Sequence, residues 1–159
     1  MKSHADEAQQ SPILDYDFFE VLVESHVRLV GRSFLPPDAT PDWLYYNAPF
    51  AVLAHGTGND PVFAYANKTA QHCFEYTWDD ITVLPSRLSA EAPERAERER
   101  LLEAVSRQGY IENYRGIRVA RSGRRFEISD GVVWQLIDQT GTPRGQAARF
   151  SSWQDLPLP

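Results

Sequence analysis

The sequence predicts an α+β protein: a five-stranded antiparallel sheet flanked by short helices and preceded by an extra N-terminal amphipathic helix. Three observations support this. Apolar residues recur at helical spacing over 17–31 and 94–108, and they alternate with the strand period from residue 110 onward. A short hairpin also precedes the second helix. Helices inserted between the second and third strands indicate an α+β architecture with the helices on one side of the sheet.

The composition suits one folded domain. The chain has 159 residues, is 42% apolar and carries a formal net charge of -6, which allows a buried core and argues against disorder. A single cysteine excludes an internal disulfide framework, and no apolar tract is long enough to span a membrane. The polar N-terminus lacks a signal-peptide pattern, so we expect a cytoplasmic protein.

The chain divides into five parts. We expect a disordered leader over 1–14, an N-terminal helix over 15–34, a proline-rich connecting loop over 35–49, the main domain over 50–154 and a tail over 155–159. Gly31 is placed to end the first helix. The loop contains several prolines, which lack the amide proton that a helix or sheet interior uses.

Local signals place the elements of the main domain. The segments 50–55 and 62–65 predict a hairpin, because a Gly/Asn/Asp cluster separates them. Asn67 and Thr77 are suited to cap two short helices. The longer helix over 94–108 follows Pro93 and ends at Gly109. The side chains that share one of its faces are Arg98, Leu101, Leu102 and Val105.

The same helix offers charge pairs at the i, i+4 spacing. Glu94 with Arg98, and Glu103 with Arg107, have the favourable orientation for surface ion pairs.

Three strands are expected after residue 110, joined by the turns RSGRR and DQTGTPRG. The apolar residues fall into separate alternating sets, which predict the side chains that face the core. These sets are Ile111, Ile117 and Val119; Phe126 and Ile128; Val132, Trp134 and Leu136; and a final strand over 147–153.

Four segments carry a resemblance to a known family. They are AHGTGNDPVFAYANKTAQHCFEYTWDDITVLPSRLSAE, GYIENYRG, SGRRFEISDGVVWQLID and GQAARFSSW. The order of the predicted helices and strands resembles that of the PAS domain. The four segments together resemble the MEKHLA domain, a PAS-related family. The resemblance is specific from about residue 55 to 153. It implies a sensory or interaction module with no assigned catalytic residues, and it leaves the cofactor unknown.

The candidate reactive residues point away from several cofactors. Flavin photosensor PAS domains use a cysteine in a Gly-x-Asn-Cys-Arg motif, whereas the corresponding segment here is VLPSRLSA, and Cys73 lies elsewhere. We therefore expect Cys73 to be a buried structural residue. The four histidines lack the spacing of a zinc site, and the longer helix has no histidine that could bind haem.

Aromatic and polar side chains suggest a ligand site on the concave face of the sheet, although the rings could also simply fill a core. Gln146 is a further polar group that could orient a ligand. The residues predicted to bind the ligand are Tyr65, Asn67, Phe74, Trp78, Arg87, Tyr110 and Trp134. Asn67 could instead act only as a helix cap, and Arg87 as an anchor for its loop.

The charge distribution bears on partners. Residues 107–149 contain eight arginines and four acidic residues, a net charge of +4, so the rest of the chain carries -10. This asymmetry fits self-association or an acidic partner. RNA binding is disfavoured, because the RNA-recognition strand signature is absent and the whole chain is acidic.

These observations favour a non-enzymatic PAS-like module that binds a small ligand and signals through a homodimer or a partner protein. One alternative is a small cone-shaped α+β enzyme with a buried carboxylate base. Glu127 and Asp138 do not fit that role, because Glu127 alternates with apolar neighbours and Asp138 begins a turn. A second alternative is dimerisation without any cofactor.

Overall fold

The structure is a computed structural model that describes residues 15–157. The expected leader over 1–14 and the end of the tail lie outside these residues. The helical elements are α2 (Tyr16–Val30), η2 (Trp43–Asn47), α3 (Lys68–Phe74), α4 (Trp78–Ile81), η3 (Ser86–Ser89) and α5 (Ala92–Gln108). The strands are β1 (Ala51–His55), β2 (Phe63–Ala66), β3 (Tyr110–Val119), β4 (Arg125–Ile137), β5 (Pro143–Phe150) and β6 (Ser152–Asp155).

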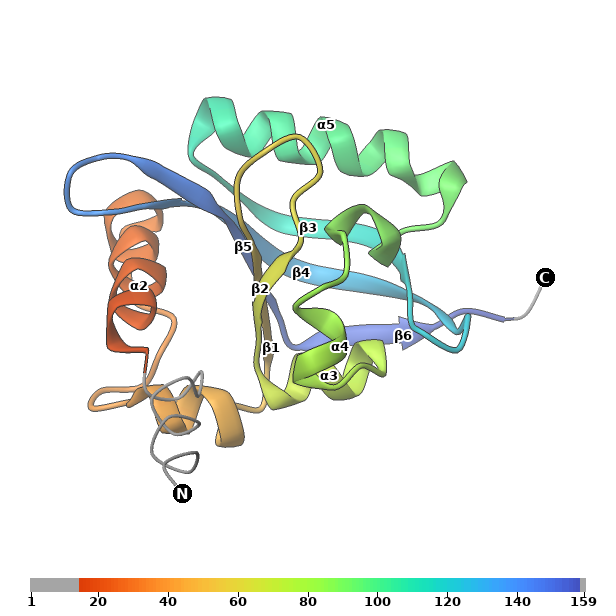
Figure 1. The fold of residues 1–159 in the computed structure, drawn as a ribbon, viewed down its shortest axis with the longest axis horizontal. Helices are drawn as coiled ribbons and strands as arrows, with labels where there is room; N and C mark the ends of the chain where they lie inside the picture. Colours follow the sequence, from red (N-terminus) through yellow and green to blue (C-terminus); the bar gives the residue numbers. More distant parts are fainter. Residues whose placement is uncertain (1–14, 158–159) are drawn as a thin grey trace, which may run out of the picture.

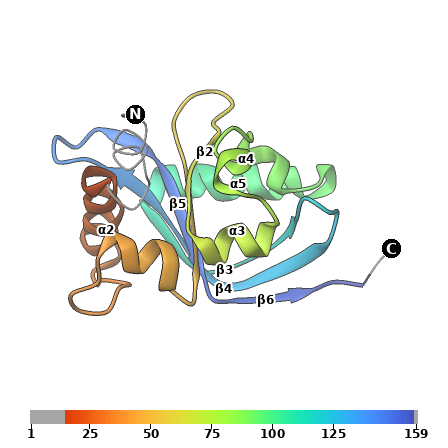
Figure 2. The same cartoon turned by 60° about the horizontal axis from the view of Figure 1, so that its bottom comes forward.

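The strands form one antiparallel sheet in the order β2-β1-β5-β4-β3, with β6 paired to the first part of β4. Figure 1 shows α2 on one side of this sheet and α3, α4 and α5 on the other, and Figure 2 shows the same separation from a second direction. We call the side under α2 the outer face and the side under α3 and α5 the inner face. The predicted α+β class is confirmed, with one short strand more than expected.

Both faces of the sheet are buried. The outer-face cluster joins α2 and η2 to the sheet through Leu22, Leu44, Tyr65 and Trp134. The inner-face cluster contains Phe74 of α3 and Val105 of α5, packed against β1, β3, β4 and β5. The sheet therefore separates two apolar layers, and β1 to β5 contribute to both, while β6 adds only Trp153 to the inner one.

The predicted helix ends are confirmed. Asp15 accepts a hydrogen bond from the Phe18 amide at 2.9 Å and so caps the start of α2, and Gly31 ends the helix with φ 92°. Asn67 and Thr77 cap α3 and α4 through the amides of the residues three positions on. Gly109 ends α5.

Asn67 also joins three segments. Its Oδ1 accepts from the amides of Val52 and Ala70, both at 3.0 Å. Its Nδ2 donates to the carbonyls of Leu44 at 3.1 Å and Phe50 at 2.9 Å. Three of these four hydrogen bonds are buried and the one to Phe50 is partly buried, so the single amide satisfies backbone atoms of β1, α3 and η2 together.

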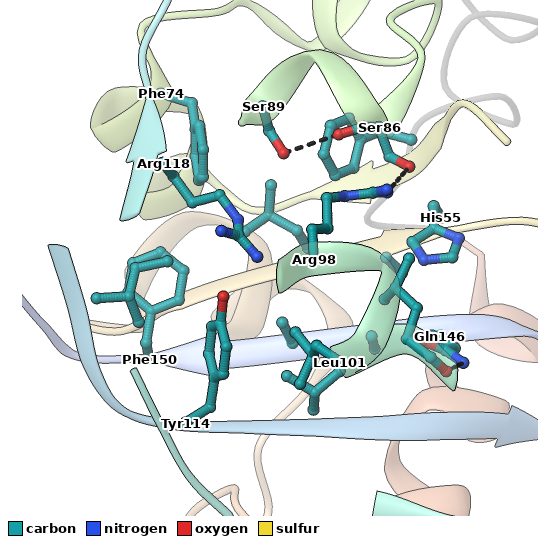
Figure 3. Close-up of a pocket in the computed structure, with 18 residues that line it drawn as sticks. His55, Phe74, Ser86, Ser89, Arg98, Leu101, Tyr114, Arg118, Gln146 and Phe150 are labelled. Carbon is teal, nitrogen blue, oxygen red and sulfur yellow. Dashed lines mark hydrogen bonds between the residues drawn. The ribbon is translucent and has the colours of Figure 1, made fainter. Parts of the chain in front are cut away.

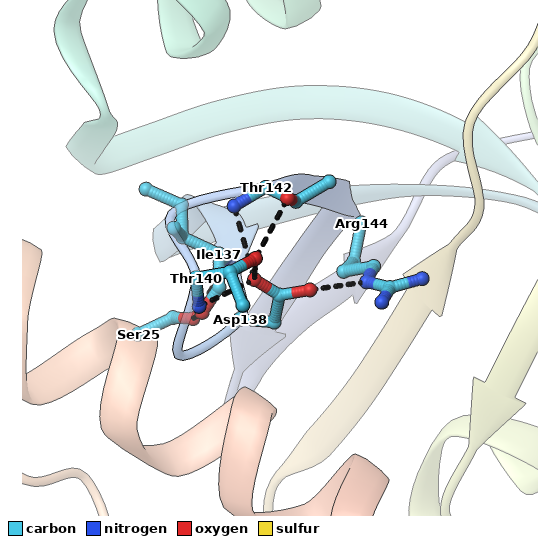
Figure 4. A network of polar contacts seen from close by, with 6 residues as sticks. All are labelled: Ser25, Ile137, Asp138, Thr140, Thr142 and Arg144. Atoms are coloured by element: carbon cyan, nitrogen blue, oxygen red, sulfur yellow. Dashed lines mark hydrogen bonds and ion pairs between the residues drawn. The ribbon is translucent and has the colours of Figure 1, made fainter.

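Helix α2 is fastened to β4 by polar contacts at a strand irregularity (Figure 4). The register shifts between Leu136 and Ile137, and Ile137 is paired with Pro143, which has no amide proton to donate. The buried Ser25 hydroxyl takes over, accepting from the Ile137 amide at 2.8 Å and donating to its carbonyl at 3.0 Å. On the outer face, the Trp134 indole donates to the Leu22 carbonyl at 3.1 Å.

Two sequence predictions are wrong in detail. The proline-rich loop over 35–49 contains the π-helical turn η2, because Leu44 and Tyr45 are apolar and pack into the outer-face cluster. The final strand over 147–153 is split at residue 151 into β5 and β6. The first pairs with β1 and β4, and the second pairs only with the start of β4.

The predicted alternation in β3 is also wrong beyond residue 112. Ile111 belongs to the inner-face cluster, and regular alternation would turn Ile117 and Val119 inward as well. Instead the register shifts between Ile111 and Tyr114, and Asn113 takes a left-handed conformation with φ 55°. This bulge turns the next set inward, which consists of Tyr114, Gly116 and Arg118.

A second left-handed residue reverses the faces in β4. Asp130 has φ 57°, and it separates Phe126 and Ile128, which face inward, from Val132 and Trp134, which face outward. The apolar sets expected in this strand therefore exist, but they lie on opposite sides of the sheet.

His26 is a fully buried polar residue on the sheet-facing side of α2. Its Nδ1 lies 2.7 Å from the Arg32 carbonyl and must carry the proton, and its Nε2 accepts from Arg149 Nε at 3.1 Å. Burial lowers the pKa of His26 to about 4, and the charges of Arg149 and Arg32 act in the same direction. Glu112, which pairs with Arg32 at 2.6 Å, opposes them.

The bulge at Asn113 gives a test of the fold. Asn113→Val should lower the free energy of unfolding by about 1–3 kcal/mol, because a β-branched residue resists positive φ. Asn113→Gly is the matched control and should unfold close to wild type in urea. Equal stability of the two variants would contradict the bulge.

Because His26 is buried in its neutral form, we expect the free energy of unfolding to fall in acid. The unfolded histidine binds a proton near pH 6.5 and the folded one only near pH 4, so stability is full above pH 6.5 and falls as the pH drops through this window. The loss should approach about 3 kcal/mol by pH 4. Urea titrations at several pH values measure it.

His26→Gln should flatten most of this dependence, with a residual slope from His55, whose pKa is also lowered by burial. His72→Gln is the control, because His72 is exposed. A wild-type slope in His26→Gln would show that another group is responsible.

Candidate functional site

A cavity of about 80 Å³ lies between the inner face of the sheet, η3 and α5 (Figure 3). Most of its wall is apolar. The apolar side chains that line it include Leu53, Phe63, Phe74, Leu101, Ile128, Val133 and Phe150. Polar side chains also line it, and they come from β1, η3, α5, β3 and β5.

Strand β3 supplies two of the polar groups because of its bulge. Tyr114 and Arg118 face inward on either side of Gly116, and the Tyr114 ring lies across this glycine. A Cβ at position 116 would come within 1.9 Å of the Tyr114 hydroxyl, so only glycine allows the ring to lie there. The Arg118 guanidinium lies over the same ring, 5.5 Å from its centroid.

Helix α5 supplies a second arginine. Arg98 is only 6% exposed and donates to the Ser86 hydroxyl of η3 at 2.5 Å. The expected surface pair with Glu94 does not form, because Arg98 lies on the buried face of the helix with Leu101 and Val105. The sequence already places Arg98 on this apolar face. Burial of that face decides the position of the side chain, and the i, i+4 spacing to Glu94 does not.

The cavity carries an excess of positive charge. Arg118, also 6% exposed, donates to Glu97 at 3.3 Å and to the Ile117 carbonyl at 2.7 Å. Arg98 has no carboxylate within ion-pair distance among residues 15–157. Burial lowers the pKa of Arg98, and the charge of Arg118 lowers it further. One partly exposed carboxylate, Glu97, thus pairs directly with one of the two buried guanidinium groups, and Glu99 and Asp60 act on Arg98 only from beyond ion-pair distance.

Three buried polar atoms around the cavity have no partner within residues 15–157: the Tyr114 hydroxyl, His55 Nε2 and Gln146 Oε1. Burial raises the pKa of Tyr114 to about 12, and the nearby Glu97 carboxylate acts in the same direction while the charge of Arg118 opposes it. The hydroxyl therefore keeps its proton, and because its geometry with Glu97 falls short of a hydrogen bond, it can donate to a ligand. His55 Nδ1 lies 2.9 Å from the Gly56 carbonyl and holds the ring proton, which leaves Nε2 as an acceptor.

Hydrogen bonds also fix which end of the Gln146 amide is left without a partner. Its Nε2 donates to the Leu102 carbonyl at 3.0 Å and to Ser106 at 3.1 Å, so Oε1 is free to accept. Buried polar atoms are normally satisfied, and three unsatisfied ones around one cavity are typical of a ligand site.

A second hollow of about 290 Å³ lies beside the cavity, under the loop 56–61 that joins β1 and β2. It shares several wall residues with the cavity, among them His55, Ser86, Arg98 and Gln146. Arg87 lies at this hollow and pairs with Asp60 at 3.0 Å. The wall of this hollow is more polar than the wall of the cavity beside it.

The structure does not bring the seven predicted site residues together. Phe74 lines the cavity, Asn67 is the buried cap described above, and Arg87 lies at the outer hollow. Three others, Tyr65, Tyr110 and Trp134, lie in the outer-face cluster because their strands turn them toward α2 or η2. Trp78, at the start of α4, packs on Tyr65 and Tyr45 of the same cluster. Gln146, suggested as an orienting group, does line the cavity.

The functional residues that the sequence prediction missed are Arg98 and Arg118. The sequence did contain a pattern that indicates burial of Arg98, because this residue shares a helical face with apolar residues. It contained none for Arg118, because the bulge at Asn113 reverses the alternation that would have turned it outward.

The residues present do not fit a flavin. The cavity of about 80 Å³ is far below the several hundred that enclose larger ligands. Cys73 is buried in the inner-face cluster away from the cavity wall, and burial raises its thiol pKa to about 12. Within residues 15–157 no three His, Cys, Asp or Glu side chains gather as a metal site, and no helix is long and apolar enough to cross a membrane.

Comparisons with solved structures identify the fold. A PAS domain from Colwellia psychrerythraea superposes with a TM-score of 0.60 and 11% identity, covering 72% of this chain and 92% of that one. The light-state dimer of the fungal blue-light photoreceptor Vivid gives 0.57 and 13%, covering 84% and 93%. The LOV domain of a blue-light activated histidine kinase from Erythrobacter litoralis gives 0.54 and 18%, covering 70% and 100%.

No curated protein sequence matches the chain. The model of the MEKHLA domain matches residues 16–155, which include α2 and the whole sheet. The resemblance seen in the sequence is thereby confirmed, and the fold is that of the PAS domain. The chain belongs to the MEKHLA domain family.

Proposed function

We propose that the protein is a non-enzymatic sensory module that binds a small molecule in the inner cavity and reports its presence through α2. The observation that carries this proposal is a cavity with three unpartnered polar atoms on one face of a sheet whose other face holds α2. Its wall has the composition of a binding site, which is mostly apolar with a few polar groups.

Neighbouring residues of β4 connect the two faces. Val133 lines the cavity, and Trp134, the next residue, packs beneath α2 and donates to Leu22. An occupant that moves Val133 must also act on the Trp134 backbone. The size of the response is limited by the difference in the occupant's affinity for the two positions of α2.

Output is proposed to run through a homodimer or a partner protein. Parts of α2 stay apolar and exposed beyond the sheet, with Tyr16 62% and Val27 40% exposed. Vivid, one of the structures with this fold, is described as a light-state dimer. Light scattering of the purified chain measures whether it self-associates.

The geometry favours binding over catalysis. Asp138 lies in the turn after β4, where its carboxylate accepts from Thr140, Thr142 and Arg144 (Figure 4). Glu127 points away from the inner face, since its neighbours Phe126 and Ile128 occupy that face. The cavity wall includes no Asp or Glu among the described residues, so neither side chain supplies the buried base that an isomerase-type site requires.

A variant that fills the cavity tests the proposal. Ala148 lines the cavity, and Ala148→Leu should occupy the space and press on β4. We expect the amides of α2 to exchange hydrogen about fivefold faster, equivalent to about 1 kcal/mol in local opening. Native mass spectrometry of freshly purified protein should show a small adduct on wild type that the variant lacks.

The control is Ala96→Leu, which adds the same side chain at an exposed position of α5. If α2 exchanges alike in all three proteins and wild type carries no adduct, the sensory proposal fails and dimerisation without a ligand is left.

A further inference from the structure

The two ends of the cavity offer opposite hydrogen-bonding groups. The Arg118 guanidinium and the Tyr114 hydroxyl converge at one end, with the Arg98 side chain reaching across the middle toward Ser86 (Figure 3). All three are donors, and two of them carry positive charge. The arrangement suits an anionic oxygen, because charge-assisted hydrogen bonds to guanidinium groups are the strongest available to a carboxylate.

The other end presents acceptors. His55 and Gln146 face each other across the β1–β5 ladder, where they are direct partners. His55 Nε2 and Gln146 Oε1 are both buried acceptors without a donor. The Arg98 guanidinium also acts on His55 from the middle of the cavity, so this end is not free of positive charge. To satisfy the two acceptor atoms themselves, a ligand must bring a hydroxyl or similar donor.

The space between the ends limits the size of the ligand. A volume of about 80 Å³ is close to the liquid volume of only about three waters. The walls along this space include Leu101, Phe150 and Val133, so the middle of the ligand must be apolar. An inorganic phosphate would match the arginines but would set its remaining oxygens against these walls and against the acceptors.

We propose that the cavity binds a short hydroxy acid, with its carboxylate at Arg98, Arg118 and Tyr114 and its hydroxyl donating one hydrogen bond at the other end, to His55 Nε2 or to Gln146 Oε1. The inference rests on the proposed function, because it names the class of molecule that the sensory cavity takes. It also explains why two guanidinium groups are buried here with only one carboxylate: the ligand supplies the second negative charge.

Binding of three matched probes to the full chain tests the inference. The probes are 3-hydroxypropionate, propionate and 3-hydroxypropionamide, measured by calorimetry and by the side-chain nitrogen signals of arginine in NMR spectra. Inorganic phosphate is titrated in the same way as a comparison. We expect 3-hydroxypropionate to bind most tightly. Propionate should bind about tenfold more weakly because it lacks one hydrogen bond, and the amide about a hundredfold more weakly because it lacks the charge.

Variants assign the contacts. Tyr114→Phe removes only the unpartnered hydroxyl, leaves the packing intact, and should weaken 3-hydroxypropionate about tenfold. Arg98→Met and Arg118→Met should each weaken it by about a hundredfold. Arg100→Met is the control, because Arg100 is exposed on the same helix, and its affinity should equal that of wild type.

Several results would overturn the inference. Equal or tighter binding of the amide would exclude an anion, equal binding of propionate would exclude the hydroxyl contact, and binding of inorganic phosphate alone would exclude an organic acid. Unchanged affinity in Tyr114→Phe would place the ligand elsewhere. If no probe binds, the hydroxy-acid assignment fails, while the response of α2 in Ala148→Leu still decides separately whether the cavity has a sensory role.

Discussion

Two guanidinium groups buried on the inner face of the sheet are the constraint on which the other features of the site depend. Taking a charge out of water is costly unless hydrogen bonds and an opposite charge compensate it. Here the compensation is incomplete: Ser86 accepts from Arg98, and Glu97 and the Ile117 carbonyl accept from Arg118. The position of η3, the glycine beneath Tyr114 and the bulge in β3 all serve to hold these two side chains in an apolar layer.

The two faces of the sheet are therefore used differently. The outer face is filled by aromatic side chains and by α2, which Trp134 and Ser25 fasten to β4 through hydrogen bonds. The inner face keeps a cavity with buried polar atoms that lack partners. Since a single strand carries cavity residues on one side and α2 contacts on the other, a change in the cavity has a short mechanical route to the helix. In the function proposed above, this division gives a PAS-type fold of the MEKHLA family an input side and an output side.

Local sequence signals predicted most of the architecture, because caps, glycine stops and hairpin turns act over a few residues. Asn67, Thr77 and Gly109 hold the positions expected of them. The site was harder to predict. A strand residue faces one side of the sheet or the other, and each bulge earlier in the strand can change that side. The left-handed Asn113 and Asp130 each reverse the alternation, so Arg118 turns inward and Trp134 turns outward. Arg98 was recognisable from its apolar helical face, but the i, i+4 pair with Glu94 was an equally local and competing signal.

The central claim is that Arg98 is buried to bind a ligand and not to stabilise the fold. The free energy of unfolding of Arg98→Met, measured by urea denaturation of the ligand-free chain, tests this most directly. Replacing a buried and poorly compensated charge by an apolar side chain of similar length should leave the protein as stable as wild type or more stable by about 1–3 kcal/mol. A loss of about 3–5 kcal/mol would show that the guanidinium is a structural group satisfied within the fold, and would contradict the account.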